Sequence, residues 1–133
     1  NDAGAQRDLA TEIEGCAERI RDRVRSMSDA DGKQLAADGQ LAGTPSIVFD
    51  AVAVLLSSEA AKALTRESAA LDFVSNAWAH LKAIAFDDGA QLLLKAGNVG
   101  KDPGVVDAAD TKAFITAAKT RQWAREPKVR MLA

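Results

Sequence analysis

The sequence predicts an α/β domain in which a doubly wound, mostly parallel sheet carries helices on both faces. The clearest strand is residues 49–56, an apolar run that hardly alternates, as in a parallel strand covered on both sides. Short strands are also predicted at 83–86 and 104–106, and helical patterns separate the three. With 133 residues, of which 47% are hydrophobic, the chain is long enough for one domain with a buried core.

The first predicted element is a helix. Leu9, Ile13, Cys16 and Ile20 are spaced four, three and four residues apart, and the pattern continues to Ser28. An Asp-Ala-Asp-Gly sequence then signals a turn, and a polar stretch follows it.

The remaining helices follow from caps and apolar spacing. Asp110 is expected to cap a last helix, with Phe114 and Ile115 facing inward and Trp123 near its end. Pro127 is expected to stop that helix, because proline lacks the N–H that a helix interior needs. Earlier helices are predicted at Ser57–Leu64, at Glu67–Leu81 and at 91–96, the last ended by Gly97.

The composition excludes several kinds of function. The net charge is -2 and the pI is near 5.4, so no excess of basic residues favours nucleic acid or an anionic membrane. Cys16 is the single cysteine, which allows no internal disulfide and no multi-cysteine metal site. His80 is the single histidine and tyrosine is absent, so we expect no haem site within the chain. Nothing in the sequence suggests secretion, and a cytoplasmic location is expected.

Four motifs, taken in order and spacing, resemble one family. An acidic stretch from Asp31 to Gly39 leads through Gly-Thr-Pro-Ser into Phe-Asp-Ala-Val at 49–52. A helix-to-strand step at 73–85 follows, then Asp-Pro-Gly-Val-Val and a tail with the sequence Trp-Ala-Arg-Glu-Pro-Lys-Val. Together they resemble the C-terminal, flavodoxin-like domain of large-subunit monofunctional haem catalases over residues 30–133. The resemblance implies a single domain over residues 1–133, of which residues 1–29 are helical and divergent.

That domain is similar in turn to class I glutamine amidotransferases and intracellular proteases, which present a catalytic cysteine on a sharp strand-to-helix turn. The matching turn here lies within residues 83–93, and Asp87 falls at the nucleophile position with Asp88 beside it. Carboxylates there cannot replace the thiolate that acyl transfer requires. The resemblance therefore implies a fold built for a nucleophile, without one, and no catalytic residue in this chain.

The resemblance also implies a sheet that lacks its first, central strand. In the family an apolar strand ends near an Asn-Asp pair, which Asn1 and Asp2 resemble. The second strand of the family is expected around residues 23–27, where Arg-Val-Arg-Ser-Met is a poor buried strand and a fair helix. Either residues upstream or a second chain complete the sheet, or the N-terminal third has rearranged.

Two pairs of side chains are candidate functional groups. Asp87 and Asp88 are expected to cap the helix that follows them, and the alternatives are an acid/base pair or a metal site. Trp123 and Arg125 form a candidate interface with a partner, and packing of the tryptophan on the last helix is the alternative.

Three further features favour structural interpretations. Cys16 lies in an apolar stripe, so a buried and inert thiol is favoured over a reactive one. His80 is expected at a helix end on the surface, not as a ligand or base. Arginine alternates with other residues over 19–25 and follows several glutamates, which favours a solvated face over an anion site.

We therefore expect a non-catalytic accessory domain that binds no metal or cofactor. By resemblance, the parent would disproportionate hydrogen peroxide at a haem whose ligands lie upstream, and this domain would contribute stability, oligomer assembly or chaperone-like binding. Expected partners are the catalase core or other copies of the chain, with homo-oligomers as one outcome. The alternatives are a stand-alone amidotransferase- or intracellular protease-like protein, or a helical interaction module.

Overall fold

A computed structural model describes residues 38–130, and its contacts divide the chain after Asp38, so the second part is described by itself. The predicted helix that ends at Ser28 lies outside the described residues. So do Cys16, the arginines at 19–25 and the strand that the family has near 23–27. No helix in the described part is long and apolar enough to cross a membrane.

Three short parallel strands form the sheet, in the order β1-β2-β3. The strands are β1 (Ala51–Val54), β2 (Ala83–Phe86) and β3 (Val105–Asp107). Ala51 lies opposite Ala83 and Ile84 lies opposite Val105. The predicted mostly parallel α/β sheet is confirmed. The strand β1 is shorter than the apolar run at 49–56. At one end Phe49 lies in a bend and is exposed, and at the other the N–H of Leu56 donates to the Asp87 side chain.

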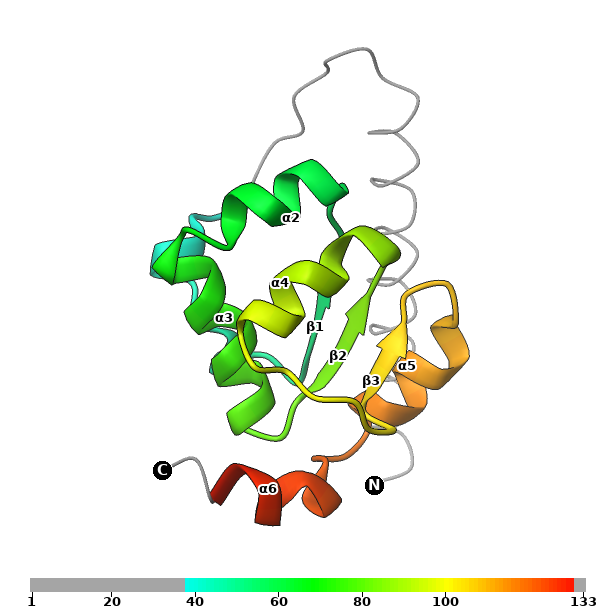
Figure 1. The fold of residues 1–133 in the computed structure, drawn as a ribbon. Helices are drawn as coiled ribbons and strands as arrows, with labels where there is room; N and C mark the ends of the chain where they lie inside the picture. The colour runs from blue at the N-terminus through cyan, green and yellow to red at the C-terminus, as the bar shows by residue number, and fades with distance from the viewer. Residues whose placement is uncertain (1–37, 131–133) are drawn as a thin grey trace. The chain divides into compact units, whose positions relative to one another are not determined.

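Helices cover both faces of this sheet (Figure 1). On one face, α3 (Ser68–Ala79) and α4 (Gln91–Ala96) pack against each other, and α2 (Ser58–Leu64) contacts α4. On the other face, α5 (Thr111–Ala118) contacts β2 and β3. Successive side chains of β2 point to opposite faces of the sheet. Ile84 therefore joins the hydrophobic core under α3 and α4, whereas the neighbouring alanines are buried outside that core.

Two of the predicted helix starts are confirmed by side-chain caps. The Ser57 hydroxyl accepts a hydrogen bond from the N–H of Ala60, and the Asp110 carboxylate accepts one from the N–H of Ala113. Gly97 ends α4 as predicted, and a Cβ there would overlap the Val74 side chain. That glycine is therefore required for close packing of α4 on α3.

The C-terminal segment differs from the expectation. The last predicted helix was to reach Trp123 and stop at Pro127, but α5 ends at Ala118. Gln122 turns the chain because its side-chain amide donates to the Ala117 carbonyl and its N–H donates to the Leu81 carbonyl. A 3-10 turn, Trp123–Arg125, then leads into a new helix, α6 (Glu126–Arg130). Proline is tolerated in the first turn of α6, where its missing N–H has no intrahelical partner.

A buried arginine joins this segment to the rest of the fold. The Arg125 side chain is 1% exposed, and its Nε donates to Asp102 Oδ2 at 2.7 Å. Its Nη1 donates to the carbonyls of Trp78 (3.1 Å) and Lys82 (2.9 Å), and the guanidinium lies over the Trp78 ring at 4.1 Å. These carbonyls flank Leu81, which has a φ of 63° at the end of α3. Arg125 therefore holds a left-handed turn that leucine rarely adopts.

The Asp102 carboxylate is held ionised by its partners. Partial burial acts to raise the pKa of Asp102, but hydrogen bonds from Arg125 and from the N–H of Gly104 outweigh it, and the pKa lies below its ordinary value of 3.8. Since the folded-state pKa is lowered, the stabilisation is present above the ordinary value and is lost as the pH falls through the folded-state value.

Asp102→Asn is expected to lower the free energy of unfolding by about 3 kcal/mol at neutral pH, because it leaves the buried Arg125 charge without its counterion. The difference between variant and wild type should shrink below about pH 4, measured by urea unfolding at several pH values. Asp72→Asn, at an exposed position of α3, serves as the control. An undiminished difference toward pH 3 would contradict this ion pair.

Candidate functional site

The turn after β2 carries Asp87 and Asp88, the two neighbouring carboxylates that the sequence predicts to cap a helix. Asp87 has extended backbone angles (φ -101°, ψ 174°) and is followed by a 3-10 turn, Asp88–Ala90, that leads directly into α4. The N–H of Asp87 donates to the Val54 carbonyl at 3.4 Å. The turn therefore lies beside the carboxyl end of β1.

Both carboxylate oxygens of Asp87 are engaged with backbone groups. Oδ1 accepts from the N–H of Ala90 at 2.9 Å, which is the predicted cap. Each oxygen also lies 3.2 Å from the N–H of Leu56, just beyond the end of β1. The side chain is thus turned inward to join two chain segments that lie 31 residues apart.

Asp88 does not take the capping position. Its carboxylate is exposed and accepts from the side-chain amide of Gln91 at 3.4 Å, because Asp87 already occupies the N-cap one residue earlier. The next residue, Gly89, approaches the segment after β1 so closely that a Cβ would overlap the Leu56 carbonyl oxygen. Glycine is therefore required here by the backbone of the neighbouring segment.

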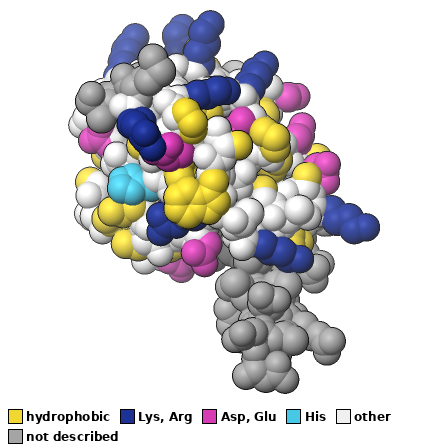
Figure 2. All heavy atoms as spheres, turned by 90° about the horizontal axis from the view of Figure 1, so that it is seen from below, with side chains coloured by type: hydrophobic (Ala, Val, Ile, Leu, Met, Phe, Trp, Pro, Cys, Tyr) yellow, Lys and Arg dark blue, Asp and Glu magenta, His cyan; other side chains and the backbone are white. Residues whose placement is uncertain are grey.

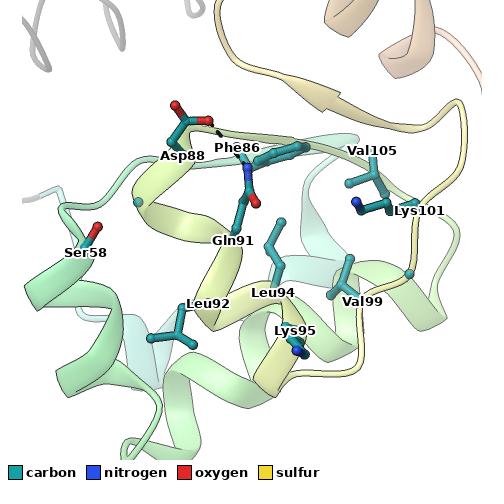
Figure 3. Close-up of a pocket in the computed structure, with 12 residues that line it drawn as sticks. Ser58, Phe86, Asp88, Gln91, Leu92, Leu94, Lys95, Val99, Lys101 and Val105 are labelled. Atoms are coloured by element: carbon teal, nitrogen blue, oxygen red, sulfur yellow. Dashed lines mark hydrogen bonds between the residues drawn. The ribbon is translucent and has the colours of Figure 1, made fainter.

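A cavity of about 710 Å³ lies beside this turn (Figure 3). It extends from the start of α2, along the outer side of α4, to the loop before β3. Asp87 does not line it, whereas Asp88 and Gly89 do. The sequence did not predict the other lining residues. They come from several elements, and the loop at 97–104 among them carries no motif beyond its glycines. The other lining residues are Ser58, Phe86, Gln91, Leu92, Leu94, Lys95, Val99, Gly100, Lys101 and Val105.

The structure separates the two candidate interface residues. Trp123 is 64% exposed, whereas Arg125 is buried in contacts within the chain and presents no side-chain surface to a partner. Figure 2 shows the end of the molecule that carries α6, where hydrophobic side chains lie among charged ones. Trp123 alone remains a candidate anchor.

His80 lies where it was expected. It is exposed at the C-cap of α3, and its N–H donates to the Asn76 carbonyl at 2.9 Å. Among residues 38–130, no group of three His, Cys, Asp or Glu side chains is placed to hold a metal ion.

Asp87→Ala is expected to lower the free energy of unfolding by about 2–3 kcal/mol, because it removes the cap and leaves the N–H of Leu56 without its acceptor. Asp88→Ala should change it by less than about 0.5 kcal/mol, since that side chain is exposed. Urea unfolding of both variants tests the contrast, and equal effects would show that Asp87 has no special structural role.

Comparison with protein families gives a match over residues 30–122 to the C-terminal domain found in long catalases. Catalase C of Rhizobium meliloti (strain 1021) is 40% identical over 120 residues, which is 86% of this chain and 17% of that protein. Catalase-B of Dictyostelium discoideum is 35% identical over 104 residues, 74% of this chain and 15% of that protein. Catalase HPII of Pseudomonas aeruginosa is 30% identical over 131 residues, 95% of this chain and 18% of that protein.

The chain spans less than a fifth of the length of these relatives. The matched region contains the whole sheet and the turn at Asp87. The predicted resemblance is confirmed, and the chain belongs to the family of C-terminal domains found in long catalases.

Proposed function

We propose that this chain is a non-catalytic accessory domain of a long catalase, whose parent reaction is the disproportionation of hydrogen peroxide at haem. The observation that carries the proposal is the geometry of Asp87. At the position of a nucleophile, its carboxylate accepts hydrogen bonds from Leu56 and Ala90 and is directed away from the neighbouring cavity. The arrangement supports a structural role for the turn, and it opposes the alternative of a hydrolase of the amidotransferase type.

The side chains of residues 38–130 do not fit a haem site. Haem iron in proteins is held by His, Cys, Met or Tyr at a pocket that the protein encloses. His80 is exposed at a helix end, the sequence holds no tyrosine, and Cys16 and both methionines lie outside the described part. We therefore expect the haem of the parent to be bound by residues outside the described part of this chain.

The contribution that we assign to the domain is stability and assembly of the parent oligomer. Trp123 supports this role because its turn is fixed from both sides. Gln122 donates hydrogen bonds to the Ala117 carbonyl at the end of α5 and to the Leu81 carbonyl. The buried Arg125 holds the other end of the turn. An exposed tryptophan on a rigid turn loses little entropy on binding, which favours it as an interface anchor. The surface that receives it belongs to the catalase core or to another copy of this domain in a cytoplasmic oligomer.

After incubation with hemin, the purified 133-residue chain is expected to leave the Soret band of free hemin unshifted and to release no more oxygen from hydrogen peroxide than free hemin does. The full-length parent supplies the positive control for both measurements. Turnover by the isolated chain at more than the rate of a heat-denatured sample would refute the accessory role.

Trp123→Ala in the full-length parent is expected to weaken the assembly by about 2 kcal/mol or more, as for a central interface anchor. The same change in the isolated chain should shift unfolding by no more than about 0.5 kcal/mol, because the side chain is exposed there.

The oligomer of the parent can be followed by analytical ultracentrifugation and its unfolding by calorimetry. Phe49→Ala, at another exposed hydrophobic position, is the matched control. If both substitutions leave the assembly unchanged, Trp123 is not the anchor. If only Phe49→Ala weakens the assembly, the interface lies around Phe49 and not around Trp123.

A further inference from the structure

The cavity beside the Asp87 turn has the features of a small-molecule site. Its volume of about 710 Å³ lies within the range of ligand pockets. Phe86, Leu94 and Val99 lie together along one part of its lining, and Val105 lies beside them (Figure 3). An apolar floor of this kind favours a ligand with an apolar body.

The charges along the cavity favour an anion. The charged side chains that line it are Lys95, Lys101 and Asp88, an excess of one positive charge. In Figure 3 the Lys101 side chain extends over the apolar end, next to Val105. Within the described residues, neither lysine makes an ion pair. The carboxylate of Asp88 accepts from the Gln91 amide and lies apart from Lys101 in Figure 3.

We propose that this cavity binds a small monocarboxylate with an aliphatic or aromatic body, its carboxylate paired with Lys101 and its apolar part between Phe86, Leu94 and Val99. This inference goes beyond the accessory role. It concerns recognition without reaction, since Asp87 is withdrawn into the fold and does not line the cavity.

Octanoate is a suitable probe, and titration into the 133-residue chain can be followed by ¹H–¹⁵N NMR. A dissociation constant of about 1 mM or tighter is expected for a ligand of this size. The amide signals of Val99, Gly100, Lys101 and Val105 should shift together. Butanoate should bind about tenfold more weakly or worse, because it buries fewer methylene groups.

Variants of Lys101 test the charge. Lys101→Gln is expected to weaken octanoate binding about two- to fivefold and Lys101→Glu to weaken it further, whereas Lys101→Arg should retain it. Lys119→Glu, exposed at the end of α5, should leave binding unchanged. Lys101 is exposed, so these variants should fold normally, which the NMR spectrum itself verifies.

Three results would overturn the proposal. The first is the absence of octanoate binding at about 10 mM, well above the expected constant. The second is equal affinity for octanamide, which has the same shape without the charge. The third is a set of shifted amides away from the cavity, which would place the fatty acid on another apolar surface.

Discussion

The fold around the site depends on one carboxylate. Asp87 accepts hydrogen bonds from the N–H groups of Leu56 and Ala90, and so joins the end of β1 to the start of α4. Strands as short as these supply few ladder hydrogen bonds, so a side-chain bridge across their carboxyl ends fixes their relative position. Gly89 reinforces the same contact, because the turn approaches the Leu56 carbonyl more closely than any side chain would allow.

The same hydrogen bonds of Asp87 underlie the proposal that this domain is non-catalytic. A nucleophile on a strand-to-helix turn must project toward substrate and be activated by a base or a lowered pKa. The Asp87 carboxylate instead faces backbone donors within the fold, and the neighbouring cavity is lined by apolar side chains together with Asp88 and two lysines. The geometry of this turn therefore supports the sheet.

Sequence patterns predicted most of the elements but few of the contacts between them. The apolar runs and caps located β2, α2 and α4 because these signals are local, and the resemblance located the turn at Asp87. The bond from Leu56 to Asp87 spans 31 residues and has no local signal. Arg125 was expected at the surface as charged residues usually are, and its burial depends on Asp102 and on carbonyls at the end of α3. The cavity was missed because Lys101 and Val99 come together with Phe86 only through the tertiary fold.

Amide hydrogen exchange at Leu56 and Ala90 tests the central role of Asp87 most directly. These two N–H groups donate to its carboxylate, so in the wild type both should exchange as slowly as the paired amides of β1. In Asp87→Ala both should exchange much faster, while amides of α5, on the opposite face, keep their relative order of protection. Fast exchange at Leu56 in the wild type, or protection that survives the substitution, would contradict the account.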